Sequence, residues 1–120
     1  MAQRIRVARQ LIHTPHVVQI SQKRTLRLAY AHYPAFGRPE HLDIAPIVIL
    51  HGLFGSKQNN RSIGKALSRQ LRCSVYALDL RNHGSSPHNA DHTYVAMADD
   101  VQEFVEGEGL GPVTLLGHSM

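Results

Sequence analysis

PVTLLGHSM, residues 112–120, decides the fold class of this chain. Its apolar part, residues 113–116, is typical of a short buried strand. The strand leads directly into G-H-S at 117–119, the beginning of G-x-S-x-G, a tight strand-to-helix turn that exposes a serine hydroxyl at the top of a parallel sheet. The stretch therefore predicts a parallel sheet with a nucleophile, Ser119, at the carboxyl end of one strand.

Two earlier apolar runs, Ile47–Leu50 and Val75–Leu78, predict strands buried on both faces of that sheet. Each is followed by a helical pattern, the first capped by Ser62 and the second by Thr93 and closed near Gly107 or Gly109. The residues expected to face inward are Ile63, Ala66, Leu67 and Leu71 in the first helix and Met97, Val101, Phe104 and Val105 in the second.

Alternating polar and apolar residues at 25–30 predict a half-exposed strand, and Pro and Gly at 34–46 predict a surface loop. Residues 81–92 predict a second, polar loop. The order strand, helix, strand, helix, strand predicts an α/β fold with right-handed crossovers onto a parallel sheet.

The charge is unevenly distributed along the chain. Residues 1–39 hold seven Lys or Arg and no acid, whereas residues 40–120 hold six Lys or Arg and nine Asp or Glu, a net charge of 6 − 9 = −3. We therefore expect no basic patch on the folded body and no binding of nucleic acid. One cysteine, Cys73, excludes an internal disulfide, and no apolar run is long enough to span a membrane.

The N-terminal arm, residues 1–24, is rich in arginine and free of acids, and apolar residues are interleaved with the basic ones. This composition is typical of a mitochondrial transit peptide. A basic tail without targeting information, a cytoplasmic protein and an arm that binds membrane lipids stay open as alternatives, and the last would show strongly salt-dependent binding.

A glycine-rich loop, H-G-L-F-G-S at 51–56, directly follows the first buried strand. In hydrolases with a G-x-S-x-G turn, one oxyanion donor comes from this loop and the other from the residue after the serine. By position these donors are the backbone N–H groups of Leu53 and Met120, and Gly52 allows the close approach of the backbone that the loop needs. An ordinary strand-to-helix turn is the alternative, and the spacing does not match a phosphate-binding loop.

The second buried strand leads into D-L-R-N-H-G-S-S-P-H at 79–88. We expect Asp79 and Arg81 to bond to each other or to nearby backbone and to support the loops beside the site. Three histidines here, at 83, 88 and 92, raise the question of a metal site, but their spacing matches no zinc motif, so we expect neither a metal nor another cofactor.

Together, H-G-L-F-G-S, D-L-R-N-H-G-x-S-P-H and G-H-S-M resemble the α/β-hydrolase superfamily, and within it the small serine esterases of the abhydrolase-domain type found in bacteria and mitochondria. The resemblance covers residues 25–120 and implies the N-terminal half of an α/β-hydrolase domain that ends at its nucleophile elbow. It implies Ser119 as the nucleophile, Leu53 and Met120 as oxyanion donors, a small ester or thioester as substrate, and a mitochondrial location.

The same resemblance implies a catalytic acid and histidine after the serine, and none of the nine histidines of this chain follows Ser119. We expect the 120-residue chain alone to be inactive and poorly soluble or loosely folded. The alternative hypothesis is a non-catalytic truncated fragment, or an incomplete gene model. Reading the coding DNA past Met120 would distinguish the two.

Overall fold

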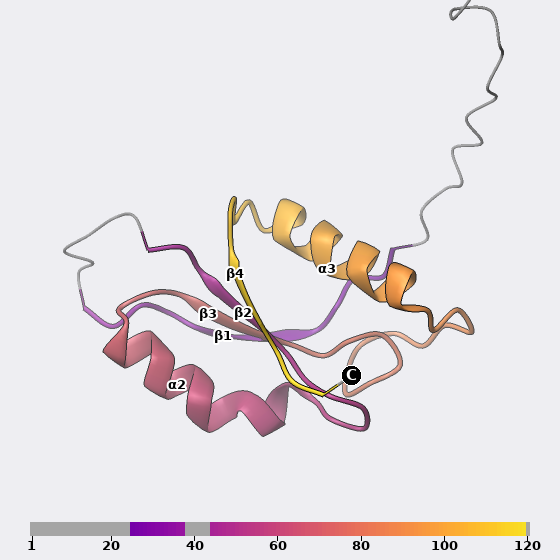
Figure 1. Ribbon diagram of the computed structural model, residues 1–120, viewed down its shortest axis with the longest axis horizontal. Coiled ribbons are helices and arrows are strands. Elements are labelled where there is room, and N and C mark those ends of the chain that lie inside the picture. Colours follow the sequence, from indigo (N-terminus) through magenta and orange to yellow (C-terminus); the bar gives the residue numbers. More distant parts are fainter. Residues whose placement is uncertain (1–24, 38–43, 120) are drawn as a thin grey trace, which may run out of the picture.

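The computed structural model describes residues 25–37 and 44–119, which form one twisted sheet with a helix on each face (Figure 1). The predicted domain boundary at residue 24 and the arm before it lie outside the described residues. Four strands make the sheet in the order β1-β3-β2-β4. Their bounds are β1 Tyr30–Tyr33, β2 Ile47–Leu50, β3 Val75–Leu78 and β4 Thr114–Gly117.

The two predicted central strands, β2 and β3, are confirmed at the residues the sequence indicates. They pair in parallel, with Ile47 opposite Val75 and Leu50 opposite Leu78. β4 pairs in parallel with the other side of β2. The carboxyl ends of the three strands therefore meet at one edge of the sheet, where a ligand site of an open α/β sheet is expected.

The first strand differs from the prediction in place and direction. It begins at Tyr30 rather than Thr25, and it runs antiparallel to β3, so the sheet is mixed. Residues 25–29 are outside the strand, and two of their N–H groups donate to side chains: that of Leu26 to Asp100 and that of Ala29 to the Ser86 hydroxyl. The Ala29 carbonyl accepts from the Asp79 N–H at 2.8 Å, just beyond the end of β3.

β4 was expected to be a buried strand, and this expectation is wrong for the described residues. All four of its residues are exposed, because β4 is the last strand in the order and only β2 pairs with it.

Two apolar clusters lie on opposite faces of the sheet, since successive strand residues point to opposite sides. Helix α3, Tyr94–Gly107, packs on the face that includes Val48 and Leu78, and its buried residues include the predicted Met97, Val101 and Phe104. Thr93 caps this helix by accepting a hydrogen bond from the Ala96 N–H, as its sequence predicts.

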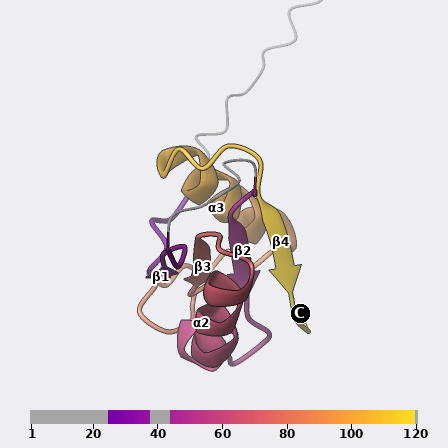
Figure 2. The same cartoon turned by 90° about the vertical axis from the view of Figure 1, so that its left-hand side faces the viewer.

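Helix α2, Arg61–Gln70, packs on the other face beside Ile49 and Val75 (Figure 2). A 3-10 helix, η1 Lys57–Asn60, precedes it and is capped by Ser56, so the predicted cap at Ser62 is wrong. The predicted inward face is confirmed only at Leu67, which packs against the Ile49 and Val75 cluster. Ile63, Ala66 and Leu71 are exposed, and Gly64 and Ser68 are buried instead.

The reason is a close approach of α2 to the sheet. A Cβ added at Gly64 would lie 2.5 Å from the Tyr33 ring, so the helix presents its smallest residue to the sheet at that point.

Helix α2 carries a line of exposed cations, although the net charge predicts no basic patch on the folded body. Arg61, Lys65 and Arg69 are all exposed, and α2 contains no acid. Helix α3 contains four Asp or Glu and no Lys or Arg. The net charge does not show this difference because it sums over both helices.

Within the described residues, no helix combines the length and the apolar character needed to cross a bilayer.

Candidate functional site

The turn after β4 places Ser119 at the carboxyl edge of the sheet. The φ angle of Ser119 is +48°, in the left-handed region that residues other than Gly and Asn avoid. The preceding residue is held to the neighbouring strand, because the His118 N–H donates to the Leu50 carbonyl at 3.2 Å. Backbone strain of this kind persists only where surrounding structure maintains it, and it is concentrated at functional sites.

The loop after β2 lies directly against this turn. A Cβ added at Gly52 would be 2.4 Å from the carbonyl oxygen of Ser119 and 2.9 Å from that of His118. The N–H of Leu53 donates to the same Ser119 carbonyl at 3.3 Å. The structure thus brings Gly52, Leu53 and Ser119 together. In this arrangement the Leu53 N–H points at main chain, while Met120 lies outside the described residues.

Two buried histidines, whose role sequence reasoning missed, join the β2 loop to the loop after β3. His51 Nε2 accepts from the Leu80 N–H at 3.0 Å, and its Nδ1 lies 2.8 Å from the Gly52 carbonyl oxygen. His83 Nε2 accepts from the Phe54 N–H at 3.3 Å, and its Nδ1 lies 2.8 Å from the Arg81 carbonyl oxygen.

The bonds of His51 fit a neutral imidazole, in which Nδ1–H donates to the Gly52 carbonyl and Nε2 accepts from the Leu80 N–H. Burial lowers the pKa of His51 below its ordinary value, although the hydrogen bond to the Gly52 carbonyl raises it. The only sequence signal for this pair is the position of each histidine beside a glycine after a buried strand.

Asp79 is fully buried and holds three segments together. Its carboxylate accepts from the backbone N–H of Lys57 at 2.6 Å and from that of Ser85 at 2.8 Å, and it forms an ion pair of 2.5 Å with the Lys57 ammonium group. Burial by itself would raise the pKa of Asp79, but the bonds from Lys57 and Ser85 outweigh it, so the pKa lies below its ordinary value. Lys57 is the third residue whose role sequence reasoning missed.

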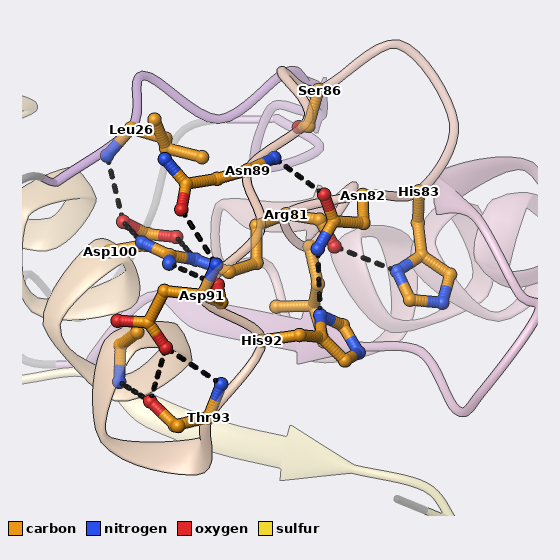
Figure 3. Close-up of polar contacts among 12 residues, drawn as sticks. Leu26, Arg81, Asn82, His83, Ser86, Asn89, Asp91, His92, Thr93 and Asp100 are labelled. Carbon is orange, nitrogen blue, oxygen red and sulfur yellow. Dashed lines mark hydrogen bonds and ion pairs between the residues drawn. The ribbon is translucent and has the colours of Figure 1, made fainter.

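Arg81 forms its ion pair with Asp100 of helix α3. Its guanidinium donates to both carboxylate oxygens of Asp100, at 2.7 and 2.8 Å, and to the Asp91 carbonyl at 2.7 Å (Figure 3). Asp100 also accepts from the Leu26 N–H, so one buried ion pair connects α3, the polar loop and the segment before β1. Both residues bond to nearby backbone as expected: Asp79 accepts from the N–H groups of Lys57 and Ser85, and Arg81 donates to the Asp91 carbonyl.

An open groove lies beside Ser119, between α3 and the β2–β4 part of the sheet. Its volume is about 750 Å³, and most of its lining is apolar, including Leu50, Met97 and Val113. Ser119, His118 and His51 line the same groove. The position of the serine beside an apolar groove suits a substrate with a hydrocarbon part.

Within the described part of the chain, the Ser119 hydroxyl forms no hydrogen bond with another residue, including its neighbour His118. The His118 side chain is exposed. The described residues also contain no group of three or more His, Cys, Asp and Glu side chains arranged to hold a metal ion. His92, one of the three histidines considered for such a site, instead lies 2.9 Å from the Asn82 amide nitrogen.

The family model for the alpha/beta hydrolase fold matches residues 45–120. This chain belongs to the α/β-hydrolase family. The match begins just before β2 and includes the β2 loop, the segment from Asp79 to Arg81 and the turn at Ser119.

Curated relatives of this α/β-hydrolase include a "Probable alcohol acetyltransferase" of Saccharomyces cerevisiae, 56% identical over 79 residues, which are 62% of this chain and 23% of the relative. The mouse "sn-1-specific diacylglycerol lipase ABHD11" is 50% identical over 74 residues, 62% of this chain and 24% of the lipase. The chain spans about a quarter of the length of these relatives.

Solved structures give the same fold. A marine microorganism esterase has a TM-score of 0.68 and 37% identity over 78% of this chain and 33% of the esterase. An esterase from Exiguobacterium antarcticum has a TM-score of 0.66 and 26% identity over 79% of this chain and 32% of that enzyme. The comparisons support an esterase-type α/β-hydrolase family, and this chain matches about a quarter to a third of the length of these proteins.

Proposed function

We propose that this chain carries the nucleophile and the oxyanion loop of a serine hydrolase that cleaves carboxylic esters or thioesters. The observation that carries the proposal is the contact of Gly52 with the strained turn at Ser119, which leaves no room for a side chain between the two loops. The names of the relatives, a lipase, an acetyltransferase and esterases, support acyl chemistry.

In the proposed mechanism, the Ser119 hydroxyl attacks the acyl carbonyl, and the catalytic histidine of the complete hydrolase domain takes its proton. The carbonyl oxygen becomes an oxyanion, which the N–H groups of Leu53 and Met120 stabilise. The Leu53 N–H must then exchange its 3.3 Å bond to the Ser119 carbonyl for one to the oxyanion. The alcohol or thiol leaves with a proton, and water releases the acyl group from the serine.

The other residues that the sequence predicts at the site have supporting roles in this proposal. Gly52 allows the loop to reach the turn, while Asp79 and Arg81 hold the segments on either side of it through Lys57 and Asp100. The apolar groove beside Ser119 accepts the hydrocarbon part of the substrate. The mechanism requires no cofactor or metal.

A graft tests the proposal. Residues 45–119 would replace the matching segment of the marine esterase, which supplies the remaining part of an α/β-hydrolase domain. We expect the graft to hydrolyse a short-chain activated ester and Ser119→Ala in the graft to lose this activity. A graft that folds, as judged by circular dichroism and a cooperative melt, but does not turn over would refute the proposal.

The 120-residue chain alone should show no turnover above background, because no base reaches Ser119 in the described part. Turnover that Ser119→Ala abolishes would show that a histidine of this chain acts as base. A non-catalytic role is the second candidate, and it is favoured if the graft is folded and inactive.

The relative named as an alcohol acetyltransferase suggests alcohol as a second acyl acceptor. Adding ethanol to the graft assay and measuring the new ester distinguishes transfer to alcohol from transfer to water.

We also propose that residues 1 to about 23 are a mitochondrial transit segment, on the strength of their arginine-rich, acid-free composition. A fluorescent reporter fused to these residues should enter mitochondria, and the same reporter with Arg4, Arg6 and Arg9 changed to Glu should stay in the cytosol. A cytosolic signal from the unmodified segment would contradict this.

A further inference from the structure

The two helices on the sheet differ in charge. Helix α2 holds three Lys or Arg and no acid, and helix α3 holds four Asp or Glu and no Lys or Arg. Figure 1 shows the two helices on opposite faces of the sheet. The helix on one face is therefore basic and the helix on the other face acidic.

The cations of α2 form a line along the helix. Arg61, Lys65 and Arg69 follow one another at intervals of four residues, so they lie on one side of α2, and all three are exposed. None of them forms an ion pair with a carboxylate in the part of the chain that the structure describes. Lys57 does not belong to this set, because Asp79 binds it.

An aromatic ring completes this surface. Phe36 is 63% exposed, and its N–H donates to the Ser68 carbonyl at 3.3 Å, which fixes it beside the helix. The Arg69 guanidinium lies over the Phe36 ring, 5.9 Å from its centroid. We call Phe36, Arg61, Lys65 and Arg69 the α2 surface.

We propose that the α2 surface binds the face of a bilayer that contains anionic phospholipids. Three cations spaced over about 12 Å of helix present charge to a plane of phosphate groups, at about 1 kcal/mol each near an anionic membrane. An exposed aromatic side chain among cations suits the headgroup region, where its ring leaves water while the charges stay at the phosphates. Nucleic acid would use the cations but gives no reason for the exposed phenylalanine.

The test is co-sedimentation of the full 120-residue chain with vesicles of phosphatidylcholine alone and with vesicles that contain phosphatidylglycerol as well. We expect binding to the anionic vesicles only, and weaker binding as salt increases. The triple variant Arg61→Gln, Lys65→Gln, Arg69→Gln should bind roughly 100-fold more weakly, which is three cations at about 1 kcal/mol each. Phe36→Ala should weaken binding several-fold.

A matched control carries the same change in net charge on the other side of the sheet. His88→Glu, Ala90→Glu and Tyr94→Glu together change the charge by −3, as the triple Gln variant does, and all three positions are exposed. This control should bind nearly as well as the unchanged chain. The basic N-terminal arm is tested in the same way, with Arg4, Arg6 and Arg9 changed to Gln.

Three results would overturn the proposal. One is a triple Gln variant that binds as well as the unchanged chain, and another is a loss that follows only from the arm variant. The third is binding of a DNA or RNA duplex, but not of anionic vesicles, that depends on the same three cations. Because the side chains substituted on α2, at Phe36 and in the matched control are exposed, circular dichroism should show these variants folded alike.

Discussion

Gly52 and Ser119 are 67 positions apart in the chain, yet a single methyl group on Gly52 would lie 2.4 Å from the Ser119 carbonyl oxygen. No real Cβ tolerates such a contact with backbone, so residue 52 must be glycine if the two loops keep their positions. This contact makes one site of two motifs that are remote in sequence.

Gly52→Ala should therefore push the β2 loop away from the turn at Ser119. We expect a destabilisation of about 2 kcal/mol, as for other overpacked sites. We also expect faster hydrogen exchange at the Leu53 amide, which loses its bond to the Ser119 carbonyl. Gly117→Ala is the control, because a Cβ there meets nothing within 4 Å, and it should change neither quantity appreciably. Equal effects of the two variants would show that the close approach is not a constraint.

Lys57→Met should destabilise the fold because it leaves the buried Asp79 carboxylate without its cation. Loss of one partner of a buried pair costs about 3 kcal/mol. Urea unfolding followed by tyrosine fluorescence would measure this, since the chain has four tyrosines and no tryptophan. Lys65→Met, on the exposed side of α2, is the matched control and should cost little.

The Asp79 pair also has a defined pH dependence. The pKa of Asp79 is lowered in the fold, so its contribution to stability is present above the unfolded value of about 3.9 and is lost as pH falls through the folded pKa. The difference between the unchanged chain and Lys57→Met should shrink in that acid range. A difference independent of pH would mean that Lys57 acts through packing alone.

His51 predicts a separate pH effect. Its pKa is lowered by burial, so the unfolded chain takes up a proton near pH 6.5 that the folded chain refuses. The contribution is therefore full above about pH 6.5 and declines as pH falls from there toward the folded pKa. His51→Gln should flatten the stability profile between about pH 7 and 5, measured by urea unfolding across that range. A profile with the same slope in His51→Gln would exclude this histidine as the source.

The exposed edge of β4 predicts self-association. Leu115 is 57% and Leu116 39% exposed, and in the described part of the chain only β2 pairs with β4. An apolar strand with an unpaired edge is a template for pairing with another chain. Size-exclusion chromatography at rising concentration should show oligomers of the unchanged chain, and Leu115→Lys should reduce them. Leu53→Lys is the control, since Leu53 is equally exposed but is not in a strand, and a monodisperse unchanged chain would refute the prediction.

Local sequence determined those parts of the structure whose signals need no distant partner. The apolar runs at Ile47–Leu50 and Val75–Leu78 form strands that are buried on both faces of the sheet, as their composition predicts. Thr93 caps α3 by accepting a hydrogen bond from the Ala96 N–H, three residues away. The α/β-hydrolase motifs are likewise recognised from their residue types and from their order along the chain.

Tertiary structure alone decided which groups meet. Gly64 faces the sheet because the Tyr33 ring leaves no room for a side chain, although helical periodicity favours Ile63 and Leu71 for that face. Lys57 forms an ion pair with Asp79, and His83 accepts a hydrogen bond from the Phe54 N–H, because parallel strands bring the loops that follow them to one edge of the sheet. The basic α2 surface is not apparent from the net charge, because only the sheet places α2, with its three cations, and α3, with its four acids, on opposite faces.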